Sequence, residues 1–353
     1  MIKENYVVIS KENIFTYPHP PYNPPEISQE LKSLPYKVEI DPSNRIYELV
    51  RKALFIYGMD NKNYGTKNWS PFSEIIEPGM TVIIKPNLVT HKHPLGNEAL
   101  LSSITHASIV RPIIDYTLLA LSGKGKIIVC DGPLEPTDFN MVCEISGLKK
   151  LISFYNSKLT ISNIQLLDLR ETMLHPQRGV IQLKGDPLGY SLVDLGDESL
   201  HTEIDSYWKK YRENLRKYHT YNKHFYVISN TALSADAIIS IPKLKTHKKA
   251  GITVAMKNFL GFTSQRDSLP HCRKGTPIEG GDEWPYRFKS SISDIMEGVL
   301  LRILAELKPT KYFSSFNKIR KLVRQLLLGI SYKNNFSNLN TIGGGMWYGN
   351  DTL

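Results

Sequence analysis

Apolar and polar positions alternate in blocks along the chain, and these blocks predict strands that alternate with helices. Five apolar, β-branched runs have the length of a strand, at residues 81–89, 126–133, 164–170, 224–230 and 236–245. Apolar positions with helical spacing lie at residues 43–57, 106–121 and 139–154. Such alternation is typical of a mostly parallel sheet with helices on both faces, so we predict an α/β fold.

The alternation does not extend over the whole chain, and its limits divide the sequence into three expected parts. Residues 1–42 are rich in proline and predict an irregular segment that wraps around its neighbour. Residues 43–308 form the expected α/β domain, with a β-ribbon inserted at 179–194. Residues 309–353 combine a basic amphipathic helix at 313–330 with irregular, glycine-rich loops, and we expect this end to be truncated.

Composition excludes several classes of protein. The 353 residues are 41% hydrophobic and 22% charged, which fits a folded core. No apolar run approaches the roughly 18 residues of a spanning helix, and the first residues lack the apolar centre of a signal peptide. The three cysteines lie far apart, so neither a disulfide framework nor an iron–sulfur cluster is expected. We therefore expect a cytoplasmic protein.

The charge indicates the kind of partner. A net charge of +10 suits an anionic ligand or surface. The chain has no helix-turn-helix spacing, RNA-binding motif or zinc finger, so specific nucleic-acid binding is not expected. We expect the ligand to be a small phosphorylated or carboxylated molecule. A nucleotide or Mg²⁺ is the cofactor that such a site could use.

The densest group of cationic side chains follows the last apolar run. Lys243, Lys245 and His247 leave the expected strand, and a helix-like segment with Lys257 and Asn258 comes next. A helix start offers unpaired backbone N–H groups, and lysines add charge, so both favour an anion. We predict anion binding here, with His247 also a catalytic candidate. A solvated basic turn is the alternative.

Polar side chains also stand at the carboxyl ends of the other expected strands. They are Lys85, Asn87, Asp131, Asp168 and Arg170. Ligands bind beyond the carboxyl ends of strands in open parallel sheets, so we expect these groups to share one site. Asp131 could hold Mg²⁺ or a ribose hydroxyl, or form a turn. His106 precedes a helix and is a binding candidate, unless Thr105 or Ser108 is simply the N-cap.

Three further segments carry candidate chemistry. In the polar loop 269–285, His271 and Glu283 could act as acid and base, and Arg273 could bind the ligand. The candidate metal ligands are Asp131, Asp282 and Asp351. In contrast, His91 and His93 flank a lysine without a third ligand at a recognised spacing, so we expect no metal there.

Several motifs together resemble one family. They are KPNLV (85–89), Thr105-His106, Asp131-Gly132-Pro133, Asp168-Leu169-Arg170, PKLKTHKKAGITVAMKNFLG (242–261), LPHCRKG…GGDEWP (269–285) and WYGNDT (347–352). This set resembles the DUF362 family, in its larger bacterial branch, from about residue 78 onward. The resemblance implies a cytoplasmic α/β protein of undefined activity. Some longer relatives append a ferredoxin-like cysteine domain, which these cysteines cannot form, so no electron-transfer role is implied.

Three functions remain open at this point. The first is an enzyme, most simply transferase- or ligase-like, that acts on a phosphorylated small molecule in polysaccharide or specialised-metabolite synthesis. The second is an accessory protein that binds a nucleotide-like ligand without turnover. The third is a peripheral membrane protein that uses the 313–330 helix on an anionic surface. The oligomeric state does not follow from the sequence.

Overall fold

The computed structural model describes residues 6–13, 16–93, 95–159, 164–199, 209–247, 251–265, 268–270 and 319. The chain divides into two compact units. Unit 1 comprises Met1–Leu169, Thr231–Lys243 and Val254–Phe262, and unit 2 comprises Arg170–Asn230, Leu244–Thr253 and Thr263–Leu353.

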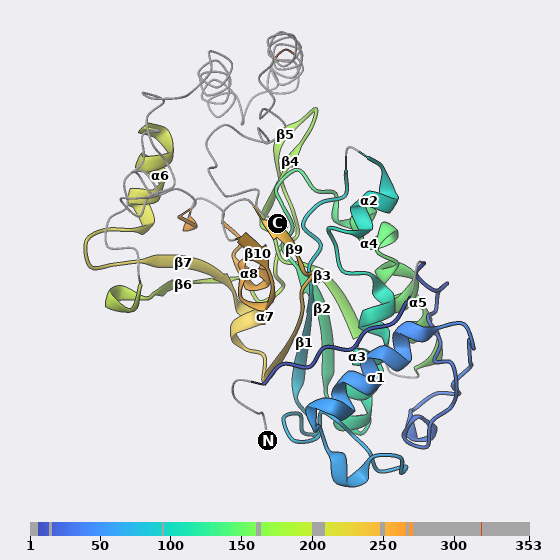
Figure 1. Ribbon diagram of the computed structural model, residues 1–353. Coiled ribbons are helices and arrows are strands. Elements are labelled where there is room, and N and C mark those ends of the chain that lie inside the picture. Colours follow the sequence, from blue (N-terminus) through green and yellow to red (C-terminus); the bar gives the residue numbers. More distant parts are fainter. Residues whose placement is uncertain are drawn as a thin grey trace. The chain divides into compact units, whose positions relative to one another are not determined.

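A four-stranded parallel sheet forms the centre of unit 1 (Figure 1). Its strands are β1 (Thr81–Pro86), β2 (Lys126–Asp131), β3 (Ile164–Asp168) and β8 (Ala237–Ile241), in the order β3-β2-β1-β8. The two central strands are apolar and almost wholly buried, as expected for a parallel sheet that is covered by helices. The predicted α/β fold with a parallel sheet is confirmed.

Helices flank this sheet and complete the core of unit 1. They are α1 (Arg45–Tyr57), α2 (Asn97–Leu101), α3 (Ala107–Leu121), α4 (Phe139–Ile145), α5 (Leu148–Lys158) and α8 (Ala255–Asn258), with 3-10 turns at Glu30–Ser33, Asn61–Asn63 and Phe259–Phe262. A further short helix, α7 (Asn230–Leu233), precedes β8. Buried side chains of α3, α5 and the central strands form one apolar cluster with Tyr22 and Leu31 of the proline-rich segment.

The single helix predicted at 139–154 is wrong, because Gly147 interrupts it. Gly147 has φ of +81°, a conformation that glycine adopts readily and other residues do not. A Cβ atom there would also lie 1.8 Å from the hydroxyl of Tyr22. The helical pattern therefore continues in the sequence, while the backbone turns to admit the tyrosine.

Unit 2 contains antiparallel ribbons. Strand β4 (Thr172–His175) pairs with β5 (Gly179–Gln182), β6 (Tyr190–Asp194) with β7 (Phe225–Ser229), and β9 (Lys245–His247) with β10 (Gly251–Thr253). Helix α6 (Lys209–Tyr218) and a 3-10 turn at Gly196–Glu198 lie between β6 and β7.

Two predictions about these strands are wrong. The segment 179–194 is not one ribbon, since β5 and β6 each pair with a different strand. The strand at 224–230 is β7, which lies in a ribbon and not in the parallel sheet. Period and composition indicate that a segment is a strand, but the partner depends on turns and on contacts distant in sequence. Among the described residues, no helix has the length and apolar character needed to cross a bilayer.

A buried ionic cluster joins the proline-rich segment to the helices of unit 1. The Arg111 guanidinium donates to the Asp115 carboxylate at 2.9 Å, and the hydroxyls of Tyr36, Tyr47 and Tyr155 donate to the same carboxylate. Burial, and secondly the Asp115 charge, raise the pKa of each of these tyrosines well above its ordinary value. The phenols therefore stay protonated and serve as donors.

Replacing Asp115 with Asn should lower the free energy of unfolding by about 3–5 kcal/mol, because Arg111 would remain buried without a counter-charge. Urea denaturation followed by circular dichroism measures this change. Glu39→Ala is the control, since Glu39 pairs with Lys158 at 3.1 Å at the surface, and its loss should cost less than about 1 kcal/mol. Equal effects of the two substitutions would contradict the role given to the buried cluster.

Candidate functional site at the carboxyl edge of the parallel sheet

The strand order places a reversal between β1 and β8. From β1 the chain passes through α3 to β2 on one side, whereas β8 pairs with the other side of β1. In doubly wound sheets, the crevice at the carboxyl ends on either side of such a reversal is the usual ligand site. Lys85 and Asn87 leave β1 at this position, and Ser240 and Lys243 lie at the end of β8.

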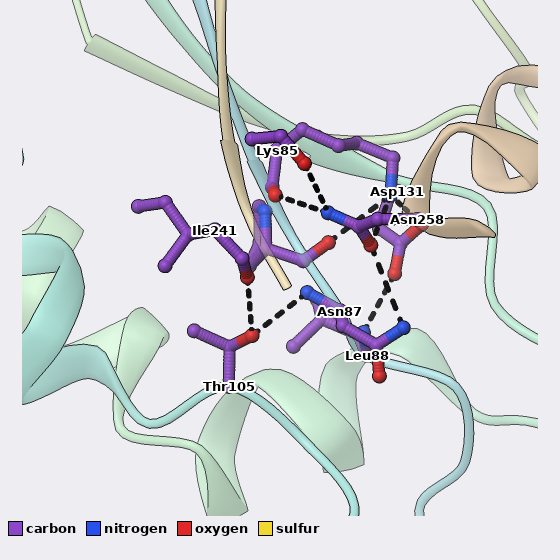
Figure 2. Close-up of polar contacts among 9 residues, drawn as sticks. Lys85, Asn87, Leu88, Thr105, Asp131, Ile241 and Asn258 are labelled. Carbon is purple, nitrogen blue, oxygen red and sulfur yellow. Dashed lines mark hydrogen bonds and ion pairs between the residues drawn. The ribbon is translucent and has the colours of Figure 1, made fainter. Parts of the chain in front are cut away.

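Lys85 is fully buried at the end of β1. Its Nζ contacts Asp131 Oδ1 at 2.5 Å, the Pro86 carbonyl at 3.0 Å and Asn258 Oδ1 at 3.4 Å (Figure 2). An ammonium group has three protons, and these contacts supply an acceptor for each. The ammonium group of Lys85 is therefore fully hydrogen-bonded within the protein.

Asp131 uses both oxygens of its carboxylate within the same network. Oδ1 receives the Lys85 ammonium, and Oδ2 accepts the backbone N–H of Leu88 at 2.7 Å. A carboxylate that leaves water requires such donors to offset its desolvation. The pair thereby joins the end of β2 to the chain that leaves β1.

Asn258, the last residue of α8, connects this helix to β1 and β8. Its side-chain N–H groups donate to the Lys85 carbonyl at 2.7 Å and to Ser240 Oγ at 3.1 Å. Its Oδ1 accepts from Lys85 and from Asn87 Nδ2, each at 3.4 Å (Figure 2). One amide side chain thus holds the two strands on either side of the reversal.

Gly261 covers the ion pair from the 3-10 turn that follows α8. A Cβ atom at this position would lie 2.1 Å from Asp131 Oδ1 and 2.6 Å from Lys85 Nζ. No side chain fits at such distances, so the backbone can approach the pair only at a glycine. The Phe262 ring adds a cation–π contact, with its centroid 5.5 Å from Lys85 Nζ.

Thr105 joins three segments at the same edge. Its hydroxyl donates to the Ile241 carbonyl at 2.7 Å and accepts the Asn87 N–H at 2.9 Å. The Thr105 N–H donates in turn to the Asn87 carbonyl at 2.9 Å. The end of β8, the chain after β1 and the residues before α3 are therefore bound together (Figure 2).

His106 itself is the N-cap of α3, in place of the alternatives Thr105 and Ser108. Its Nδ1 accepts the Ser108 N–H at 3.3 Å. The ring stacks on Tyr17, with centroids 3.9 Å apart, and Tyr17 accepts a hydrogen bond from Lys243 Nζ at 2.9 Å. Burial, and secondly the Lys243 charge, lower the pKa of His106 to about 4. The imidazole is therefore neutral at pH 7.

The first backbone N–H groups of α3 already have acceptors within the protein. The N–H groups of Ala107, Ser108 and Ile109 donate to the Ser146 carbonyl, His106 Nδ1 and the His106 carbonyl. These N–H groups are engaged within the protein, so the electrostatic attraction for an anion at this edge must come mainly from side chains.

The lysine-rich block has a different structure from the one predicted. The parallel strand ends at Ile241, and Lys245 and His247 lie on the β9–β10 hairpin of unit 2. The helix that carries Lys257 and Asn258 begins only at Ala255 and has four residues. The alternation of β-branched and polar residues in this block favours a hairpin, and Gly251 opens its second strand.

The remaining predicted site residues fall into two groups. Asp168 ends β3 in register with Asp131, whereas Arg170 is buried in unit 2. The others lie outside the described residues: His271, Arg273, Asp282, Glu283 and Asp351. The 313–330 segment also lies outside them, apart from Ile319.

Several residues of this edge could not be predicted from the sequence. Tyr17, Ser240 and Gly261 carried no signal of their own, because each acts through a neighbour that is distant in sequence. Within the part of the chain that the structure describes, no three His, Cys, Asp or Glu side chains are grouped as metal ligands.

Comparison with known families adds one finding. Residues 197–324 match the family described as "Domain of unknown function (DUF362)". The resemblance to DUF362 is thus confirmed over this range, which includes Lys243, Lys257 and Asn258. No curated protein and no solved structure matches the chain.

Removing the charge of Lys85 should destabilise unit 1 through its partner. Lys85→Met leaves Asp131 buried without a cation and should cost about 3–5 kcal/mol in the free energy of unfolding. Asp131→Asn should cost a similar amount, and the double variant should cost clearly less than the sum. Urea titration of the unmodified protein, the two single variants and the double variant gives this double-mutant cycle. Additive losses would contradict the pairing.

The depressed pKa of His106 predicts a pH effect. Between pH 6.5 and about 4 the unfolded chain binds a proton that the native ring excludes, so the free energy of unfolding falls as the pH falls. The slope is at most about 1.4 kcal/mol per pH unit, and it vanishes above that range. His106→Asn keeps an N-cap residue and should reduce this acid sensitivity in urea titrations at each pH. Exposed His19→Asn is the control and should leave the slope unchanged.

Proposed function

We propose that the carboxyl edge of the unit 1 sheet binds a phosphorylated or carboxylated small molecule, nucleotides included. The observation that carries the proposal is the strand reversal between β1 and β8, where Lys243 and His106 lie together through Tyr17. The reaction class that we favour is transferase- or ligase-like, in the cytoplasm.

The residues of this edge divide into a scaffold and a binding group. Lys85, Asp131 and Asn258 satisfy one another and hold the strand ends, so their part in the proposal is structural. Lys243 follows the carboxyl end of β8 and donates to the Tyr17 hydroxyl at 2.9 Å, beside His106. Its place at this edge makes Lys243 the side chain that we expect to contact the anion. Asn87 and Lys257 are the further candidates from the same unit.

Neutral His106 would supply a hydrogen bond from Nε2 in this arrangement, because its Nδ1 accepts the Ser108 N–H. Its low pKa keeps it unprotonated at pH 7, and its Nδ1 is engaged as the helix cap. Cationic groups that are already in place stabilise the negative charge that develops in group transfer, and this is the largest contribution in many enzymes. Binding without turnover, as in an accessory protein, is the second possibility.

Lys243→Ala should reduce ligand-dependent stabilisation at this edge. We expect screening of nucleotides, sugar phosphates and small carboxylates by thermal denaturation to yield at least one stabilising ligand for the unmodified protein. Loss of one charged hydrogen bond should weaken its binding by about tenfold to a hundredfold. Lys124→Ala is the matched control, because Lys124 is exposed before the amino end of β2.

Two results would contradict the proposal: no stabilising ligand in the screen, or equal losses of binding for Lys243→Ala and Lys124→Ala. The stabilising ligand is then incubated with the protein, and the mixture is analysed by mass spectrometry. This measurement distinguishes an enzyme from an accessory protein. A converted ligand supports the enzyme, and an unchanged ligand supports the accessory role.

A further inference from the structure

One side chain of the proline-rich segment lies at the edge where the proposed ligand binds. The Tyr17 ring stacks on the His106 imidazole, with centroids 3.9 Å apart and an angle of 21° between the planes. The Tyr17 hydroxyl accepts a hydrogen bond from Lys243 Nζ at 2.9 Å, and this Nζ lies 5.6 Å from the centroid of the Tyr17 ring. Tyr17 therefore presents an aromatic ring to His106 and an oxygen to Lys243 at the same time.

The imidazole on which Tyr17 stacks is held in place by other residues. Its Nδ1 accepts the Ser108 N–H at 3.3 Å, as the N-cap of α3. The ring of buried Tyr22 approaches it edge-on, with centroids 5.3 Å apart. The hydroxyl end of Tyr22 lies where Gly147 leaves room for it. The His106 ring would thus keep its position if the Tyr17 side chain moved away.

Tyr17 lies outside the anchored part of the proline-rich segment. It is half-buried, and residues 19–20, which follow it closely, are exposed. The anchored part begins at Pro21, whose carbonyl accepts from Arg111 Nη1 at 2.6 Å, and continues with Tyr22, which belongs to the apolar core. Tyr17 can therefore leave His106 without displacing the residues that complete this core.

An anionic ligand would compete with Tyr17 for Lys243. The hydroxyl of a tyrosine is an uncharged acceptor, whereas a carboxylate or phosphate oxygen carries negative charge. An ammonium group binds a charged oxygen more strongly, because Coulomb attraction adds to the hydrogen bond. The position of the Tyr17 hydroxyl is therefore one that an anionic oxygen would occupy more favourably.

The Tyr17 ring indicates what else the ligand should contain. In tyrosine the oxygen is attached directly to the ring, so an aromatic molecule that carries its anionic group on the ring can reproduce both contacts. In a nucleotide the ribose separates the base from the phosphate, and a sugar phosphate has no aromatic ring. Burial lowers the pKa of His106 to about 4, so an aromatic ligand would stack on a neutral imidazole at pH 7.

We propose that Tyr17 occupies the ligand position of this site, and that the ligand which replaces it is an aromatic ring bearing a phosphate or carboxylate group. The ligand ring stacks on His106, and its anionic oxygen accepts from Lys243. This inference rests on the proposed function, because Lys243 contacts the anion in both. It adds that the ligand is aromatic and that Tyr17 competes with it.

Calorimetry with phenyl phosphate, cyclohexyl phosphate and inorganic phosphate tests the proposal on the full chain. Tyr17→Ala should bind phenyl phosphate about tenfold more tightly than the unmodified protein does, because the competing side chain is absent. In this variant phenyl phosphate should also bind more tightly than cyclohexyl phosphate, which has the charge without the aromatic ring, and than inorganic phosphate. Benzoate and cyclohexanecarboxylate give the same comparison for carboxylates, and the pair with the larger difference identifies the anionic group.

Two variants serve as controls for Tyr17→Ala. Tyr221→Ala removes a tyrosine that is 94% exposed in unit 2, and it should leave the affinity for phenyl phosphate unchanged. Adding Lys243→Ala to Tyr17→Ala should weaken the binding of phenyl phosphate by about tenfold or more, because the charged donor is lost.

A nuclear magnetic resonance titration of His106 tests the contact with Tyr17 without any ligand. Loss of the stacked ring exposes the imidazole to water, so Tyr17→Ala should raise the pKa of His106 from about 4 towards 6.5. Addition of phenyl phosphate to this variant should then shift the His106 signals.

Three results would overturn the role given to Tyr17. They are an unchanged pKa of His106 in Tyr17→Ala, weaker binding of phenyl phosphate in Tyr17→Ala than in the unmodified protein, and no preference for the aromatic member of either pair of compounds. The proposed function is tested separately, by the dependence of ligand binding on Lys243. A ligand that requires Lys243 but binds more weakly to Tyr17→Ala would support the proposed site and would make Tyr17 a ligand contact instead of a competitor.

Discussion

The buried ion pair between Lys85 and Asp131 is the constraint on which the edge of the parallel sheet depends. Removing two charges from water is costly, and the attraction between them offsets this cost only where other hydrogen bonds complete both groups. The Pro86 carbonyl, Asn258 and the Leu88 N–H provide these bonds. The turn after β1, the end of β2 and α8 must therefore meet at one point.

The same requirement explains two other features of unit 1. Gly261 is needed where the backbone passes over the pair, because the available space excludes even a methyl group. Around Arg111 and Asp115, three tyrosine hydroxyls complete a second buried pair and hold the proline-rich segment against α3 and α5. In both places a buried charge specifies which distant segments come together.

Polar residues at the end of a strand can thus have two different roles. Lys85 and Asp131 have the residue types of an anion or metal site, yet each is satisfied within the protein. Lys243, which donates to the Tyr17 hydroxyl beside His106, belongs instead to the binding site that we propose. Lys85 and Lys243 are both lysines near the carboxyl end of a parallel strand, so their contacts are what separates their roles.

The sequence by itself determined the strands and most helices of unit 1, because apolar periodicity follows directly from which side of an element is buried. It also indicated the polar carboxyl edge of the sheet. The pairing of β5 and β6 with different strands, the break at Gly147 and the short α8 depended on the tertiary structure. The ion pair of Lys85 with Asp131 and the hydrogen bond of Lys243 to Tyr17 also depended on the tertiary structure. They join residues that are 46 and 226 positions apart. Such contacts leave no local pattern, since each partner is specified only by the packing of the rest of the chain.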